Sequence, residues 1–156
     1  MIFWTTLLVI HGLIALALLG AITHQSVALW WPVRDRAGSF VARFRAVRST
    51  SYVTAIILLY VIAFILGAWL YTQYRFTARV ALEQLRFFKT VGTFELKEHL
   101  ATIGLILLPA YWAYWRQPLS PGYADARRQV TLLLAILVWC NFLIGHVVNN
   151  ARGLGS

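Results

Sequence analysis

Charged residues are missing from four long stretches of the chain and gather in the segments between them. The uncharged stretches contain 33, 26, 17 and 23 residues and run from Met1 to Val33, Ser49 to Tyr74, His99 to Trp115 and Gln129 to Ala151. A helix needs roughly 20 apolar residues to cross about 30 Å of hydrocarbon, and each stretch reaches or nearly reaches this length. The pattern predicts an all-α protein whose single transmembrane domain, 1–156, has four spans over about 2–30, 50–73, 95–115 and 129–150.

Short connections between the spans predict an up-down four-helix bundle, in which the first span lies diagonal to the third and the second to the fourth. The segment from Arg75 to Val91 between the second and third spans carries polar residues at helical spacing: Arg75, Arg79, Glu83 and Arg86. Such a pattern is typical of an amphipathic helix lying in the membrane interface. This helix either rests on lipid, covers a site as a lid, or docks another subunit.

The composition agrees with an integral membrane protein. Hydrophobic residues make up 60% of the chain and charged residues 12%, with a mean hydropathy of +0.70, whereas soluble domains carry about 25% charged residues. Four spans leave only connecting loops, so we expect no separate soluble domain. Cys140 is the single cysteine, which excludes an intrachain disulfide and a covalently attached haem c. The net charge of +9 is better explained by membrane topology and anionic lipids than by nucleic acid.

The distribution of Lys and Arg predicts the orientation. Eight basic residues lie on one side of the four spans: Arg34, Arg36, Arg43, Arg45, Arg48, Arg116, Arg127 and Arg128. Six lie on the other: Arg75, Arg79, Arg86, Lys89, Lys97 and Arg152. The positive-inside rule therefore favours both termini outside, on the periplasmic face.

The four histidines are the strongest chemical signal, because ionisable groups inside membrane spans are costly and mark function. With the N-terminus outside, His11 lies about ten residues, or roughly 15 Å, below the start of the first span. His99 opens the third span from the same side, and His146 lies near the outer end of the fourth. Three histidines on three helices are therefore expected in one leaflet. His24 lies near the inner interface and is interpreted as an interfacial or interhelical hydrogen-bonding residue.

Two of the three outer histidines would suit the axial positions of one haem b, since imidazole nitrogen is a good axial ligand. Diagonal helix placement favours His11 with His99, whereas depth favours His99 with His146. Gly12 and Gly145, each beside a histidine, would let a macrocycle approach the backbone. The cations on this side are candidates for pairing with propionates: Arg75, Arg79, Lys97 and Arg152.

In this layout the chain resembles the four-helix membrane b-type cytochromes, which transfer electrons between quinones and other redox partners. The resemblance rests on His11, His99 and His146 within four spans that cover nearly the whole chain. Many of those cytochromes carry two haems with four histidine ligands. This chain offers only one depth in the membrane at which two histidines could ligate a haem, because no other histidine is expected at the depth of His24.

A transition-metal ion is the rival ligand for the same residues. Glu95 lies four residues before His99 and Glu98 is adjacent to it, so a mixed set of His11, His99, His146, Glu95 and Glu98 would suit zinc, iron or copper. Glu95 could also orient His99. Alternatively, Thr93 caps the helix and Glu95 serves as a favourable charge in its first turn.

These observations predict a membrane-embedded electron-transfer protein or redox-complex subunit that binds one haem b near the outer face and is not an enzyme on its own. Its partners would be the lipid bilayer, other membrane subunits or an outer-side redox protein, and a quinone. Two alternatives stay open: a cofactor-free structural or assembly subunit of a larger membrane complex, and a membrane metal-binding protein, either a transporter or a metalloenzyme.

Overall fold

The structure is a computed structural model that describes residues 2–31, 49–118 and 120–151, the last three of them as backbone only. Its elements are α1 (Ile2–Trp30), the short 3-10 helix η1 (Ser49–Ser51), α3 (Tyr52–Phe76), α4 (Ala78–Gln84), α5 (Phe88–Arg116) and α6 (Pro121–Ala151). The prediction of an all-α chain is confirmed for these residues. The arginine-rich segment 34–48, on which the predicted orientation partly depends, lies outside them, as does Arg152.

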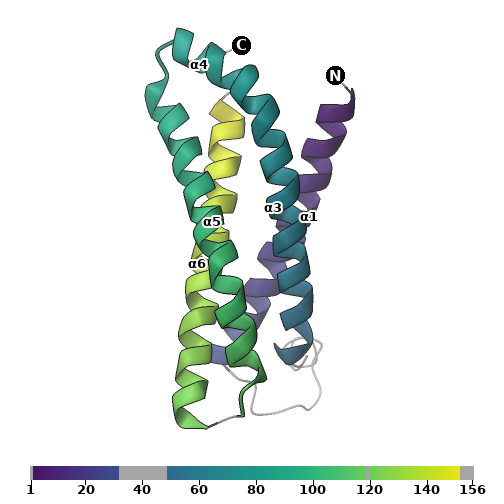
Figure 1. Cartoon of the computed structure of the whole chain (residues 1–156), viewed down its shortest axis with the longest axis vertical. Helices are drawn as coiled ribbons and strands as arrows, with labels where there is room; N and C mark the ends of the chain where they lie inside the picture. Colours follow the sequence, from purple (N-terminus) through teal and green to yellow (C-terminus); the bar gives the residue numbers. More distant parts are fainter. Residues whose placement is uncertain (1, 32–48, 119, 152–156) are drawn as a thin grey trace.

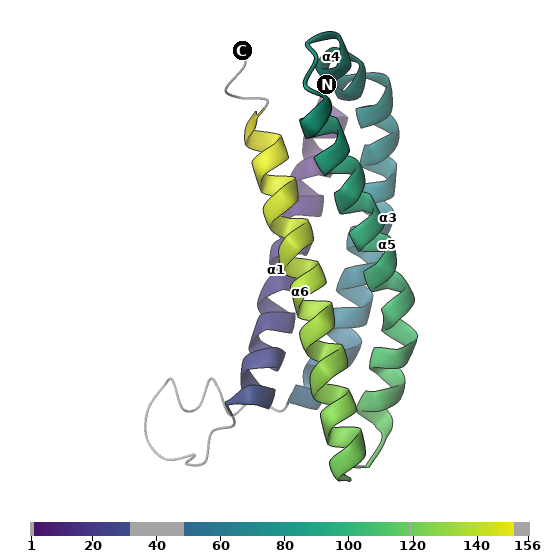
Figure 2. The ribbon, with the colours of Figure 1, turned by 90° about the vertical axis from the view of Figure 1, so that its left-hand side faces the viewer.

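The four long helices lie side by side and alternate in direction along the molecule (Figures 1 and 2). α1 packs against α3 and α6, and α5 packs against α6 and α3, so α1 is across from α5 and α3 is across from α6. We call the end at which α1 begins and α6 ends the α4 end, because α4 lies there (Figure 1). The opposite end, near Trp30, Ser49, Arg116 and Pro121, is called the distal end.

Three of these helical segments are long and apolar enough to cross a membrane: Ile2–Trp30, Ser49–Phe76 and Pro121–Val148. α5 falls below this level of hydropathy although it has 29 residues. Its second half carries Tyr111, Trp112, Tyr114 and Trp115, and such amphipathic rings prefer the membrane interface to the hydrocarbon. The chain is therefore compatible with a membrane protein.

The helix boundaries differ from the predicted spans where a helix continues past its apolar stretch. α5 begins at Phe88 rather than near 95, and α6 begins at Pro121 rather than near 129. Thr93 consequently lies inside α5, where its hydroxyl donates a hydrogen bond to the Lys89 carbonyl at 2.8 Å, so the prediction that it caps this helix is wrong. A charged residue indicates where a chain would leave the lipid. The helix itself can continue beyond that residue into water.

The segment between α3 and α5 is also more broken than the predicted helix from Arg75 to Val91. α4 has seven residues and ends in a Schellman turn, in which the Phe87 N–H donates to Leu82 at 2.8 Å and the Arg86 N–H donates to Glu83 at 3.0 Å. Arg86 adopts the left-handed conformation required by this turn, with φ 61°. The turn reverses the chain, and α5 begins two residues later.

The hydrophobic core lies toward the distal end. It is built from buried side chains of all four long helices, among them Ile22, Ile56, Tyr111 and Leu134, which are fully buried. Gln25 and Tyr111 are buried polar groups in this region that are paired, whereas Ser26 Oγ is buried without a hydrogen-bond partner among the described residues. Tyr111 donates a hydrogen bond to Gln25 at 2.6 Å, and Gln25 donates to the Ser49 carbonyl at 2.9 Å.

Candidate functional site

Toward the α4 end, the helices line a partly open cavity of about 500 Å³. Its walls come from α1, α3, α5 and α6, and most of them are apolar. The polar side chains that line it include His11, Tyr74, Lys97, Glu98, Asn141 and His146. A concave, mostly apolar space with a few convergent polar groups is the usual form of a ligand site.

His11 enters this cavity from α1, where it is half-buried and rests on α3. A Cβ added at Gly67 would lie 3.2 Å from the His11 Cε1 atom, so the ring packs closely against the α3 backbone and would have to shift by a few tenths of an ångström to admit a larger residue. The Nδ1 atom of His11 is buried and has no hydrogen-bond partner. A buried imidazole nitrogen without a partner is costly, and at a cavity wall it suggests a ligand atom.

His146 reaches the same cavity from α6, which packs directly against α1. Its ring lies nearly parallel to that of Phe142, one turn earlier, with centroids 6.3 Å apart. Two of the three outer histidines identified in the sequence therefore line one cavity.

His99 does not join them. Its side chain is exposed on α5, and its Nδ1 atom lies 2.8 Å from the backbone oxygen of Glu95 in the preceding turn. Consecutive helical residues are about 100° apart, so Lys97 and Glu98 face the cavity while His99 faces away from it. The predicted depth placed the three histidines at similar levels, but depth gives no information about the face of the helix.

The remaining predicted residues lie at the surface near α4. Glu95 forms an ion pair with Arg79 at 2.9 Å, and Arg79 also bonds Glu83 at 2.8 Å. The hydrogen bond that Arg79 donates to Glu83, together with the negative charges of Glu83 and Glu95, raises the pKa of Arg79. Arg75 is exposed and lies 6.0 Å from the Tyr71 ring centroid, outside the cavity lining.

Metal-binding geometry is not found among the described residues, where no group of three or more His, Cys, Asp and Glu side chains is close enough to hold an ion. Of the predicted metal set, His11, His146 and Glu98 line the cavity, whereas His99 and Glu95 are directed elsewhere. The five residues are therefore divided between the cavity and the surface.

Lys97 and Asn141 also line the cavity, and sequence reasoning gave neither of them a site role beyond placing Lys97 among four cations. Asn141 donates a hydrogen bond from Nδ2 to the Leu137 carbonyl at 2.8 Å, while its Oδ1 atom is buried without a partner. Its signal in the sequence was an amide within the apolar run VWCNFLIG, because polar groups inside a span usually serve a purpose.

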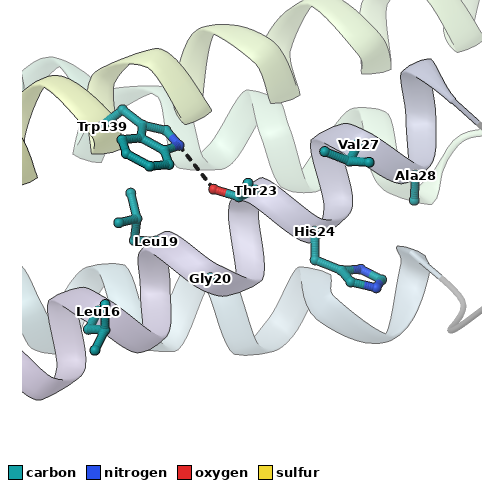
Figure 3. A pocket seen from close by; sticks show the side chains of 8 residues that line it. All are labelled: Leu16, Leu19, Gly20, Thr23, His24, Val27, Ala28 and Trp139. Atoms are coloured by element: carbon teal, nitrogen blue, oxygen red, sulfur yellow. Dashed lines mark hydrogen bonds between the residues drawn. The ribbon is translucent and has the colours of Figure 1, made fainter. Parts of the chain in front are cut away.

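His24 lies away from this cavity, toward the distal end, beside a second pocket of about 400 Å³ (Figure 3). Thr23 and Trp139 both line that pocket, and the indole N–H of Trp139 donates a hydrogen bond to the Thr23 hydroxyl at 3.0 Å. The His24 ring points away from them and stacks on Tyr52 of α3, with centroids 4.8 Å apart. This packing agrees with an interhelical role for His24.

Comparison with known proteins gives no match to a family model, a curated protein or a solved structure. The chemistry of the cavity therefore has to be inferred from its own residues.

Proposed function

We propose that the chain is an integral membrane electron-transfer protein, or a subunit of a redox complex, and that α1, α3, α5 and α6 cross the bilayer as an up-down four-helix bundle. Three of these helices are apolar enough to cross alone. α5, which packs against α6 and α3, is long enough to span with them, since 29 residues extend about 43 Å. In this arrangement the α4 end and both chain termini face the outer, periplasmic side.

We further propose that the cavity holds one haem b, with His11 and His146 as its axial ligands. The observation that carries this proposal is the convergence of two imidazoles, from the adjacent helices α1 and α6, on one cavity. The partnerless Nδ1 of His11 supplies a lone pair or a proton without breaking an existing hydrogen bond. A volume of about 500 Å³ lies within the roughly 300–1,000 Å³ of cofactor and small-molecule sites.

A bound haem would supply one-electron redox chemistry at its iron. The contribution of the chain would be to hold the iron through two helices, to exclude water with apolar walls, and to set the local charge through Lys97 and Glu98. A quinone or an outer-side redox protein would exchange electrons at the α4 end. A chain with so little mass outside its helices suits a role as carrier or subunit rather than as an enzyme on its own.

The optical spectrum of the purified, haem-reconstituted protein tests this proposal. We expect a Soret band that sharpens on reduction, with resolved α and β bands typical of bis-histidine ligation. His11→Ala and His146→Ala should each abolish that spectrum, because one axial ligand is lost. His99→Ala and His24→Ala serve as matched controls and should retain it.

Two results would contradict the assignment. Retention of the bis-histidine spectrum in both His11→Ala and His146→Ala would remove these residues as ligands. A colourless protein that takes up no haem and purifies with stoichiometric partner subunits would instead support a cofactor-free structural role.

A further inference from the structure

An ion pair inside the cavity departs from the ordinary geometry of a helix. Lys97 and Glu98 are neighbours in the chain, yet Lys97 Nζ lies 2.7 Å from Glu98 Oε1. Side chains at positions i and i+1 of a helix do not face each other, so both must bend toward the same space to meet. They are 14% and 24% exposed respectively, which is low for surface charges. The cavity wall therefore carries a positive and a negative group directed at one another.

The Lys97 side chain is positioned by contacts with Gly145 of α6 and with Phe94 of its own helix, α5. Its stem passes over Gly145 of α6, where an added Cβ would lie 3.3 Å from Lys97 Cε. The ammonium itself is 5.1 Å from the Phe94 ring centroid, a cation–π distance. Lysine stems commonly extend along apolar surface to place their charge, and here the stem leads the charge into the cavity.

Lys97 is the one Lys or Arg in the described lining of this cavity. Arg75 is exposed, and Arg79 is already engaged by two carboxylates. The ammonium of Lys97 has three donors, and among the described residues Glu98 accepts one hydrogen bond from it. The site therefore combines a positioned cation, spare donors and a large apolar volume.

We propose that Lys97 anchors the carboxylate of a ligand whose apolar body fills the cavity, in competition with the Glu98 carboxylate. This inference rests on the proposed function where the ligand is haem, because the carboxylate is then a propionate. A fatty acid offers the same chemistry, a carboxylate on an apolar body. Both sources need the same contact, a charge-assisted hydrogen bond to Lys97 Nζ.

The experiment measures binding of haemin, haemin dimethyl ester and a fluorescent long-chain fatty acid to the full chain in detergent. The dimethyl ester keeps the iron and the macrocycle but has no carboxylate. The variants are Lys97→Met, which keeps the length of the stem without its charge, and Lys97→Arg, which keeps a charge. Lys89→Met is the matched control, since Lys89 is the only other lysine and is exposed on the same helix. Circular dichroism checks that each variant folds.

We expect the wild-type chain to bind haemin about tenfold more tightly than its dimethyl ester, the effect of one charged hydrogen bond. Lys97→Met should bind both equally, while Lys97→Arg and Lys89→Met keep the preference. Glu98→Gln should tighten haemin binding, because the competing carboxylate is removed. Fatty-acid binding that depends on Lys97, in a chain that takes up no haemin, would uphold the anchor and refute the haem assignment.

The inference is overturned if haemin and its dimethyl ester bind the wild-type chain alike, or if Lys97→Met behaves as Lys89→Met does. Failure of both haemin and the fatty acid to bind would overturn the anchor and the proposed function together.

Discussion

The two ends of the helix assembly differ in their interior, which holds a hydrogen-bonded polar network at the distal end and a cavity at the α4 end. Toward the distal end, Gln25 bonds both Tyr111 and Ser49, and the Trp115 indole donates to Thr131 at 3.1 Å. Toward the α4 end, the helices leave a cavity of about 500 Å³. Two buried polar atoms that belong to residues of its lining, His11 Nδ1 and Asn141 Oδ1, have no partner among the described residues, and Ser26 Oγ toward the distal end has none either.

We interpret this difference as a division between a part of the chain that stabilises the helix packing and a part that we propose binds a ligand. A buried polar network in which every group is paired specifies a unique packing of the helices around it. Buried groups without partners cost free energy, and proteins accept that cost mainly where a ligand or a reaction repays it. The paired Gln25 network therefore helps to hold the helices in register, and the cavity at the α4 end is the place where we propose that a ligand binds.

Gln25→Leu should have the largest effect on stability. The substitution removes two hydrogen bonds and leaves the Tyr111 hydroxyl buried without a partner, which costs about 2 kcal/mol in the free energy of unfolding. Titration with SDS, followed by circular dichroism, measures it. Tyr111→Phe combined with Gln25→Leu should cost less than the sum of the two single variants, because neither unpaired group then remains. Strict additivity would show that the two residues do not interact.

Gly104→Ala should be less damaging and should act at the boundary between the two ends. Tyr60 of α3 lies against Gly104 of α5 and donates a hydrogen bond to the Ala101 carbonyl at 2.9 Å, at the floor of the cavity. An added Cβ would overlap the Tyr60 hydroxyl and lie 2.7 Å from Cζ, so the ring has to move. Overpacking costs about 1 kcal/mol or more in unfolding free energy, and we expect a value near that lower limit because the Tyr60 ring borders the cavity and can shift into it.

The same unfolding titration measures Gly104→Ala, with Gly92→Ala as its control, because nothing lies within 4 Å of a Cβ added at Gly92. Tyr60→Phe in the Gly104→Ala background should recover part of the loss by removing the overlapping hydroxyl. Equal stability of Gly104→Ala and Gly92→Ala would contradict the close contact.

Asn141→Leu should have the smallest effect on stability, and its sign is the sharpest test of the comparison. Leucine has a similar volume and removes a buried oxygen that has no partner, so the unfolding free energy should change by less than about 0.5 kcal/mol or increase. Thermal unfolding monitored by circular dichroism measures the change. A loss as large as that of Gln25→Leu would mean that polar groups support the fold equally at both ends.

Charge spacing predicted the number of long helices and the whole of α1, because a charge is the clearest indication that a chain leaves an apolar environment. It could not predict that α5 and α6 extend through their polar first turns, since helices continue into water when local propensity allows. The sequence was a poorer guide to the face that each helix turns toward the cavity than to the helix boundaries. Apolar residues surround these helices on nearly all sides, so periodicity alone could not show that His11 and His146 face one cavity while His99 faces outward.

The placement of His11 and His146 has a consequence for biosynthesis. His11 lies on the first of the described helices to be synthesised and His146 on the last. α1 and α6 can pack against each other only after α6 has emerged from the ribosome. His11 and His146 therefore cannot both contact a ligand before α6 has been synthesised. A ligand held between His11 and His146, as we propose, would therefore bind only after α6 has been synthesised, and a nascent chain arrested before α6 would not retain it.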